Sequence, residues 1–395
     1  MPRLKTDRAF YLMLMWLCVI YVCGYSSMSH AQGPSHTQVL VVHTDFVSID
    51  KFKQLQHVAQ QHQVDINHIS LGKDSNIADA VQKAQIVIFD VPRPSDRAQV
   101  IEQALPQVQA LQRPLLSIGG GALHTEHIDP VQAQRLAALY QQGGAENFAE
   151  FFQALHRWQQ TGDLVVAEAQ VLPEMAIYHP KSQRLFKTAP EYVDWYNRQF
   201  PQTTARLVYV VHPSQVSNLT TQRLDTLIEL TQNKHVMPMV LLWNEAKASG
   251  QVSAYFKDVP ITALVNLTHI QNGQAWIEEL KQLNVPMIQA LNFHGDQTQW
   301  QQSSSGVPPH LASIFLSLPE TWGLSDPSIL SLETDGTSQW LPEQVDSLLA
   351  RIQAQANLQH RAPHEKRVAV MFWNYPAGQN NLSASNLNIP KSIEN

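Results

Sequence analysis

The residue types that most often perform chemistry gather at two places in the first third of the chain. His124, Glu126 and His127 could ligate a metal ion, but three residues between two loops do not define a tetrahedral site. Gly119–Gly121 follows an apolar run, where backbone N–H groups can cradle an anion. The triplet lacks the G-x-G-x-x-G spacing and any Walker lysine, so we interpret it as a turn and predict no nucleotide site. H-E-x-x-H, C-x-x-C, G-x-S-x-G and kinase patterns are also missing from the sequence.

His179 is a third candidate, because it follows the short apolar run Met175–Tyr178. Loops after the strands of α/β folds collect ligand-binding groups. An imidazole in such a loop can hold a metal ion or transfer a proton. The alternative is a loop histidine without a role, and the sequence around it, including Pro180, leaves both interpretations open.

The end of the chain carries a further candidate. Arg367–Trp373 is an apolar run rich in β-branched and aromatic residues, and a polar loop, Asn374–Gly378, follows it directly. Such a run is typical of a buried parallel strand that delivers side chains to a loop at its carboxyl end. We therefore predict that Trp373, Asn374 and Tyr375 lie at the edge of a sheet.

The elements that must position these residues alternate along the chain from Gln38 onward. Short apolar runs alternate with helix-period segments, which predicts βαβ units and parallel sheets. The predicted fold class is α/β, with two or three Rossmann-like or flavodoxin-like doubly wound units. We expect an α/β domain with a helical extension over residues 38–162 and a second α/β region over 173–395. The main expected strands are 39–43, 86–91, 115–118, 175–178, 207–211, 236–243, 261–267 and 285–291, and the main expected helices are 49–61, 96–111, 191–200, 218–232 and 274–283.

The first 31 residues have the features of a secretory signal. Three basic residues precede an apolar run, which ends before the small-residue site Ser29-His30-Ala31. We expect cleavage after Ala31, with an uncleaved anchor as the alternative, and an exported protein that is periplasmic or anchored to the inner membrane facing the periplasm. Both cysteines lie in this segment, so the exported part cannot form a disulfide. Its removal changes the net charge from −6 to about −8, which argues against a nucleic-acid partner.

Several segments of the second region resemble one protein family. The C-terminal FWNYP loop and the turn Leu387-Asn388-Ile389-Pro390-Lys391-Ser392 resemble segments of the large subunits of metal chelatases, the CobN cobaltochelatase and magnesium-chelatase H-subunit family. Similarity extends to the I-Y-H-P segment ending at Pro180, to the segment Asn284–Leu291 and to the W-Q-Q-S segment at Trp300. Leu318–Gly323 stands where the family has an L-P-E segment, but Thr321 and Trp322 replace a hydrophobic residue and an acid.

The resemblance implies a site that handles a tetrapyrrole. Its substrates would be the macrocycle and a divalent metal ion such as cobalt or magnesium. Metal insertion requires an apolar cleft with aromatic faces, an imidazole or carboxylate for the ion, and a base for the pyrrole protons. The resemblance assigns the catalytic and metal-binding roles to His179 and Glu320, and the tetrapyrrole contacts to four residues: Trp300, Trp373, Asn374 and Tyr375. The alternative for Glu320 is a glutamate that caps a turn.

Members of that family are much longer than this chain, so we expect the sequence to correspond to an N-terminal portion. We expect part of an exported CobN-like chelatase that inserts or removes a metal. The alternatives are a periplasmic module that binds a tetrapyrrole or metal without turnover, and a segment that only docks a partner. Family chelatases of the cytoplasmic type act with ATP-hydrolysing subunits, whereas an exported protein meets no ATP. The partners would then be other chelatase subunits or a membrane transport system.

Overall fold

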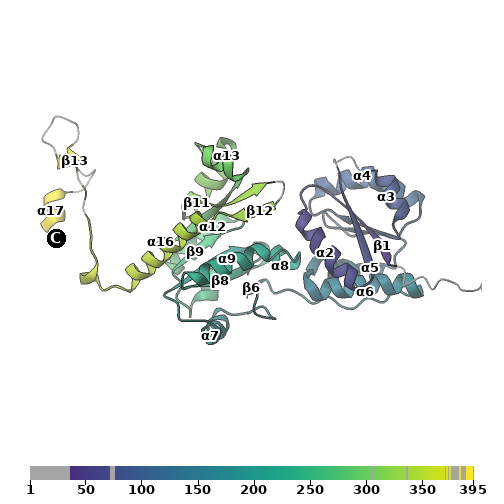
Figure 1. The fold of residues 1–395 in the computed structure, drawn as a ribbon, viewed down its shortest axis with the longest axis horizontal. Coiled ribbons are helices and arrows are strands. Elements are labelled where there is room, and N and C mark those ends of the chain that lie inside the picture. The colour runs from purple at the N-terminus through teal and green to yellow at the C-terminus, as the bar shows by residue number, and fades with distance from the viewer. Residues whose placement is uncertain are drawn as a thin grey trace, which may run out of the picture. The chain divides into compact units, whose positions relative to one another are not determined.

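The computed structural model describes residues 36–71, 76–304, 306–334, 337–369, 371, 373–374, 382–383 and 388–394. The chain divides into two compact domains, shown in Figure 1. The first domain comprises residues 1–172 and 214–220, and the second comprises 173–213 and 221–395. The sequence prediction places all of 173–395 in one region, whereas the short helix α8 (Ser214–Ser217) groups with the first domain.

The centre of the first domain is a five-stranded sheet between two layers of helices. Its strands are β1 (Thr37–His43), β2 (Val64–Ser70), β3 (Ile86–Asp90), β4 (Leu115–Ile118) and β5 (His124–Glu126), and its main helices are α2 (Ile49–Gln61), α3 (Ile77–Lys83), α4 (Pro94–Ala110), α5 (Pro130–Gln142) and α6 (Gly144–Thr161). The strand order is β2-β1-β3-β4-β5, with only β5 antiparallel to its neighbour. Helices α2, α5 and α6 cover one face, and α3 and α4 cover the other. This is the flavodoxin-like arrangement.

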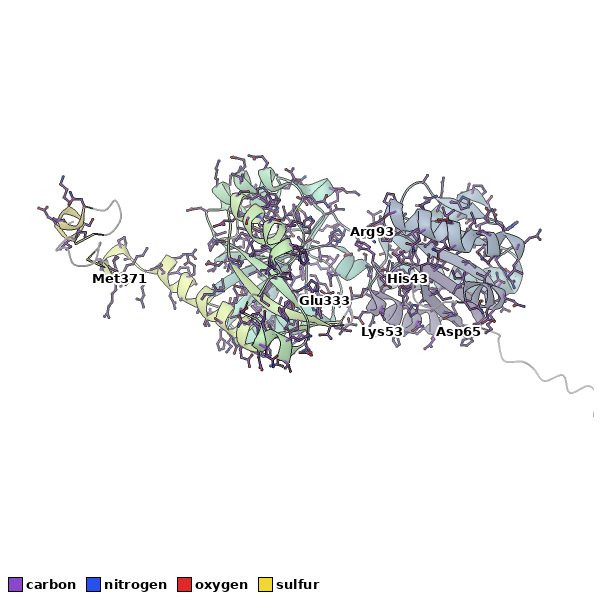
Figure 2. The ribbon with its side chains drawn as sticks, turned by 90° about the horizontal axis from the view of Figure 1, so that it is seen from above. His43, Lys53, Asp65, Arg93, Glu333 and Met371 are labelled. Carbon is purple, nitrogen blue, oxygen red and sulfur yellow. The ribbon has the colours of Figure 1, made fainter. Side chains whose placement is uncertain are left out.

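A buried ion pair lies at the carboxyl edge of this sheet. Asp90 ends β3, and its Oδ2 accepts hydrogen bonds from Lys51 Nζ at 2.6 Å and from Tyr140 Oη at 2.9 Å. The Lys51 and Asp90 side chains are each only 9% exposed. Figure 2 shows His43 and Arg93 toward this edge of the domain and Asp65 toward the opposite edge. The pair joins helices α2 and α5 to the central strands.

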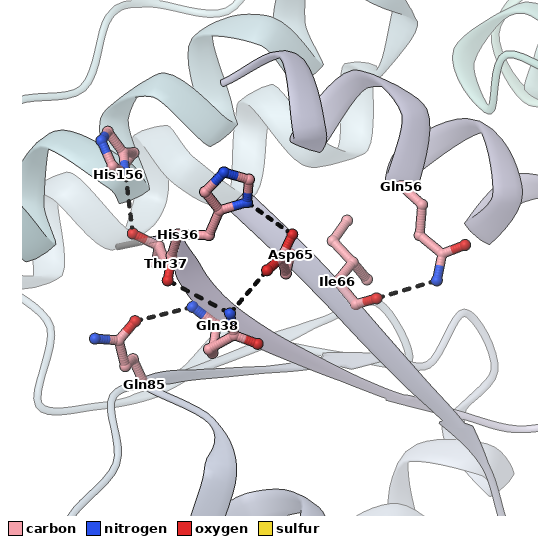
Figure 3. A network of polar contacts seen from close by, with 8 residues as sticks. All are labelled: His36, Thr37, Gln38, Gln56, Asp65, Ile66, Gln85 and His156. Carbon is pink, nitrogen blue, oxygen red and sulfur yellow. Dashed lines mark hydrogen bonds and ion pairs between the residues drawn. The ribbon is translucent and has the colours of Figure 1, made fainter. Parts of the chain in front are cut away.

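At the amino edge, side-chain hydrogen bonds tie β1 to both of its neighbours (Figure 3). Gln38 Nε2 donates to Asp65 Oδ2 at 2.9 Å, and the backbone N–H of Gln38 donates to Gln85 Oε1 at 2.8 Å. His36 Nδ1 lies 2.9 Å from Asp65 Oδ1, and this hydrogen bond lowers the pKa of Asp65. These contacts help to set the parallel register of Gln38 opposite Asp65.

The glycine triplet after β4 forms a tight turn packed against the loop after β3. A Cβ atom at Gly119 would lie 2.8 Å from the carbonyl oxygen of Val91, and one at Gly120 would lie 2.7 Å from the carbonyl oxygen of Arg93. Both glycines have positive φ angles, +84° and +61°. Arg97 donates a hydrogen bond to the carbonyl oxygen of Ala122 across the same turn. The close approach of two backbones explains the glycines, as the turn interpretation predicts.

The second domain has the same parallel core with an antiparallel strand at each edge. Its strands are β6 (Met175–Tyr178), β7 (Ala205–Val211), β8 (Val236–Trp243), β9 (Ala263–Asn266), β10 (Met287–His294), β11 (Leu324–Thr334) and β12 (Thr337–Trp340). Their order is β12-β11-β10-β9-β7-β8-β6. Strands β7 to β11 are parallel, and β6 and β12 run against them. The α/β fold class and the doubly wound units are therefore confirmed.

Helices cover both faces of the second sheet. The domain's helices up to His360 are α7 (Ala189–Gln199), α9 (Gln222–Asn233), α10 (Glu245–Ala248), α11 (Val252–Phe256), α12 (Gly273–Leu283), α13 (Gln297–Gln302), α14 (Pro309–Ala312), the π-helix η1 (Ser313–Ser317), α15 (Leu318–Thr321) and α16 (Pro342–His360). Helices α7, α11 and α12 pack in one apolar cluster with β7, β8 and β9. Helices α9 and α16 contact each other and the same sheet. Among the described residues, no helix combines the length and apolar character that crossing a membrane requires.

The segment after α16 differs from the sequence prediction. A buried parallel strand is expected at Arg367–Trp373, but residues 366–369 have no regular structure, and Val368 and Met371 are 84% and 82% exposed. In the described part of this segment, the short strand β13 (Trp373–Asn374) pairs antiparallel with β14 (Leu382–Ser383), and helix α17 (Ile389–Glu394) follows. Both lateral edges of the seven-stranded sheet end in antiparallel strands, β12 and β6, and the described residues of the run pair with neither of them.

Candidate functional site

His179 lies on the loop that follows β6, as predicted. That loop, however, lies beside the amino ends of the parallel strands and not beside their carboxyl ends. Because β6 is antiparallel to β8, its last residue, Tyr178, pairs with Val240, and its first residue, Met175, pairs with Trp243 at the end of β8. The carboxyl end of β6 thus points toward the amino ends of the parallel strands. The expectation that His179 joins the carboxyl-edge loops fails, since it assumes that β6 is parallel.

The His179 ring is almost fully enclosed by aromatic side chains. It is 1% exposed, and its centroid lies 4.9 Å from that of Trp195 and 5.2 Å from that of Phe200. Burial lowers the pKa of His179 to about 4, so the ring is neutral at pH 7. Its Nδ1 accepts a hydrogen bond from the backbone N–H of Lys181 at 3.2 Å. The other ring nitrogen, Nε2, lies 3.5 Å from Gln232 Nε2, so each nitrogen of the ring already faces an N–H group of the protein.

His179 forms part of the floor of a groove at the amino edge of the second domain. The groove has a volume of about 760 Å³, within the range of ligand sites. We call it the His179 groove, and its main side chains are those of His179, Lys181, Tyr196, Phe200, Asp225, Glu229, Gln232 and His235. It combines aromatic rings, two carboxylates, an ammonium group and imidazoles in one concave surface.

The carboxylates come from one face of helix α9. Asp225 and Glu229 are four residues apart and are therefore neighbours on the helix surface. Asp225 Oδ1 accepts a hydrogen bond from Tyr178 Oη at 2.7 Å. Burial raises the pKa of Asp225 nevertheless. A carboxyl group with a raised pKa is suited to accept and release a proton nearer to neutral pH.

The opposite side of the groove is aromatic. Phe200 is partly buried, and Lys181 Nζ lies 5.1 Å from the centroid of its ring. The Phe200 ring stands 4.6 Å from that of Tyr196, whose Oη accepts a hydrogen bond from Gln232 Nε2 at 3.2 Å. Tyr196 thus links α7 to α9, and Phe200 packs on the Tyr196 ring at the end of α7. The sequence points to an amphipathic helix in this region but not to these groove residues, whose only signal is the helical spacing of Asp225 and Glu229.

Glu320 and His179 lie far apart in the second domain. Glu320 is exposed on α15, directly before β11, whereas His179 follows β6. Five strand spacings separate β11 from β6 in the sheet, which corresponds to roughly 24 Å at about 4.8 Å per strand. The geometry therefore gives no support to a metal site shared by His179 and Glu320, and the separate roles of the two residues stay predictions.

The predicted tetrapyrrole contacts are also dispersed. Trp300 packs on Phe293, with ring centroids 5.4 Å apart, in an apolar cluster separate from the His179 groove. Trp322, which departs from the family pattern, packs with its indole against Gly273 at the start of α12. The side chains of Trp373 and Asn374, and all of Tyr375, lie outside the described residues. Their roles stay predictions.

The described part of the chain contains no group of three or more His, Cys, Asp or Glu side chains placed to hold a metal ion. His124 Nε2 lies 3.3 Å from Glu126 Oε1, and no third ligand joins this pair. His127 has a φ angle of 54°, as a turn residue does. The structure places His124 and Glu126 on the short edge strand β5, not between two loops.

Comparison with known proteins decides the family. The sequence model of CobN/Magnesium Chelatase matches residues 137–395, about two thirds of the chain. The chain belongs to the CobN/Magnesium Chelatase family. The matched range contains all of β6, α7 and α9, so every residue of the His179 groove lies within the CobN-like part.

Named CobN/Magnesium Chelatase relatives match over a limited part of their own length. The chain is 26% identical over 248 residues to magnesium-chelatase subunit ChlH, chloroplastic, of Oryza sativa subsp. indica, which covers 56% of this chain and 18% of that protein. It is 24% identical over 260 residues to aerobic cobaltochelatase subunit CobN of Pseudomonas aeruginosa, covering 62% of this chain and 20% of that protein. The alignments thus span about a fifth of these curated relatives.

A solved CobN-type structure shares the fold. The catalytic subunit of cobaltochelatase from Mycobacterium tuberculosis superposes with a TM-score of 0.63 at 16% identity, over 87% of this chain and 29% of that one. At this identity the likeness concerns the fold alone. It extends beyond the range of the family match, since 87% of the chain exceeds residues 137–395.

Proposed function

We propose that this chain forms part of a tetrapyrrole metal chelatase and that the His179 groove binds the macrocycle. The observation that carries the proposal is the family match, which includes every element of the groove. The groove adds a volume of about 760 Å³ and the chemical groups that metal exchange needs.

Each wall of the His179 groove suits one part of a tetrapyrrole. Phe200 offers an apolar face to the planar ring. Lys181 can pair with a carboxylate on the ring periphery. Asp225, with its raised pKa, is the candidate base for a pyrrole proton. A divalent ion such as cobalt or magnesium is the second substrate, and Asp225 and Glu229 are the oxygen ligands nearest to the proposed macrocycle.

Binding can be tested by Soret absorption with a metal-free porphyrin. We expect a saturable shift with the chain, and binding weakened about tenfold by Phe200→Ala, equivalent to roughly 1.4 kcal/mol of lost ring contact. Trp300→Phe is the matched control, because Trp300 lies in another cluster. Loss of the shift with Trp300→Phe and its retention with Phe200→Ala would place the macrocycle at Trp300 instead.

Metal insertion separates catalysis from simple binding. In the longest form that the native host produces, Asp225→Asn should slow insertion by roughly a hundredfold or more while the porphyrin affinity stays unchanged, because the amide keeps the shape but cannot accept a proton. Porphyrin binding without metal-dependent product from cobalt or magnesium would favour the second candidate function, a binding module without turnover. The direction of the reaction is read from the same assay started with the metallated ring.

We further propose that the protein is exported, and that it acts with other chelatase subunits or a membrane transport system. The basic and apolar segment before Ala31 supports export. Fractionation of the native host, followed by mass spectrometry of the N-terminus, tests this. Recovery in the periplasm or inner membrane is the expected result. A cytoplasmic protein that retains Met1 would contradict it.

A further inference from the structure

A second cavity lies at the opposite edge of the second sheet from the His179 groove. Loops and strand ends from β9, β10 and β11 line it, together with the segment from Val307 to Phe315. We call it the carboxyl-edge pocket. It lies at the carboxyl ends of β9, β10 and β11, one strand away from β7, where the strand order reverses. Ligands of open α/β sheets bind outside the carboxyl ends of the strands, and none of the predicted site residues lines the pocket.

The pocket is small and has one apolar wall. Its volume is about 230 Å³, equivalent to roughly seven or eight water molecules in the liquid. A tetrapyrrole exceeds this space, whereas a single substituted ring fits it. Val307, Leu311 and Phe315 provide branched and aromatic surface on one side. Phe315 belongs to the π-helix η1, a kind of element found often at functional sites.

The facing wall is polar and is held in place by hydrogen bonds. The buried hydroxyl of Ser331 donates to Asn292 Oδ1, so the Asn292 amide nitrogen is the part left to donate to a ligand. Gln289 is 7% exposed, and its Oε1 accepts from Asn266 Nδ2 at 2.9 Å. Gln289 Nε2 donates one of its two hydrogens to the carbonyl oxygen of Ala290, so the second hydrogen can be donated to a ligand. The wall therefore presents fixed N–H donors.

The residues that line the carboxyl-edge pocket disfavour an anionic ligand. The residues that line the carboxyl-edge pocket include no lysine or arginine. Of its two imidazoles, His294 has Nδ1 3.8 Å from the carboxylate of Glu333, and His269 packs on Phe315. A carboxylate ligand would lose its hydration without gaining a cation. A carboxamide of the same shape would accept from the N–H donors and donate to an imidazole or to the Thr268 hydroxyl.

From this geometry we infer that the carboxyl-edge pocket binds a small uncharged aromatic ring that carries a carboxamide. The ring packs against the Phe315 wall, and the carboxamide oxygen accepts from Asn292 and Gln289. This site is separate from the proposed tetrapyrrole groove and does not depend on it.

Saturation-transfer NMR on the full chain at pH 8, where free imidazoles are neutral, tests the inference with nicotinamide as probe and nicotinate as its charged counterpart. We expect transfer to nicotinamide, competition by benzamide, and at least tenfold weaker binding of nicotinate. Asn292→Asp, which replaces the amide donor with a negative charge at an exposed position, should abolish nicotinamide binding. Asn357→Asp on the exposed surface of α16 is the matched control and should leave binding unchanged.

Three results would overturn the inference: no transfer to nicotinamide, equal binding of nicotinate, or full binding by Asn292→Asp. Because the readout contains no tetrapyrrole, Phe200→Ala should not alter it. Failure here and failure of the His179 groove are therefore distinguishable.

Discussion

Replacing Lys51 with methionine should destabilise the first domain by about 3–5 kcal/mol. The substitution removes the ammonium group that lies 2.6 Å from Asp90 and leaves a buried carboxylate with only the Tyr140 hydroxyl as a hydrogen-bond donor among the described contacts. An unpaired buried charge costs this much, whereas an intact buried pair contributes little net stability. Hydrogen exchange of β1 and β3 peptides in the full chain measures the effect.

Two variants make this prediction specific. Lys53→Met removes an exposed partner of Asp50 on the same helix and should change stability by less than about 0.5 kcal/mol. The double variant Lys51→Met, Asp90→Leu removes both buried charges and should recover much of the lost stability. A loss below about 1 kcal/mol for Lys51→Met would mean that Asp90 reaches water.

Acidification from pH 7 to pH 4 should destabilise the second domain through His179. The pKa of this histidine is about 4 in the folded chain, against an unfolded value near 6.5. The unfolded state therefore binds the proton first, and stability falls as pH decreases below about 6.5. The loss is on the order of 3 kcal/mol at pH 4, at 1.36 kcal/mol per pKa unit. Asp225, whose pKa is raised, offsets part of it at the acid end.

Urea unfolding followed by tryptophan fluorescence checks the pH effect, because most described tryptophans lie in the second domain. His179→Asn is the informative variant, since its side-chain oxygen can replace Nδ1 as acceptor for the Lys181 N–H. It should be less stable at pH 7 and lose most of the pH dependence. An unchanged pH profile in the variant would exclude His179 as the source. His43 and His68, whose pKa values burial also lowers, act in the same direction but in the first domain.

The sequence predicts the alternation of elements well, because buried parallel strands are continuous apolar runs. It misses β2, whose polar residues Asp65, Asn67 and His68 interrupt the run at the edge of the sheet. It also cannot give the direction of a strand. β6 is as apolar as a parallel strand, yet it pairs antiparallel with β8. This direction alone places His179 beside the amino ends of the parallel strands.

The sequence also cannot show which candidate site residues lie close together. Family-like segments identify residues, but the strand order decides which of them meet. Glu320 and His179 lie near opposite ends of that order, while Phe200 and Asp225, which carry no motif of their own, meet beside His179. The same holds for Asn292 and Ser331, which converge only because β10 and β11 are neighbours.

Hydrogen exchange measured by mass spectrometry, with and without saturating metal-free porphyrin, tests the central claim most directly. If the macrocycle binds in the His179 groove, peptides that cover residues 179–203 and 225–235 should gain protection, and those of the first domain should not change. Protection confined to the segment around Trp300, or to residues outside 173–235, would contradict the account even if the Soret shift shows that porphyrin is bound.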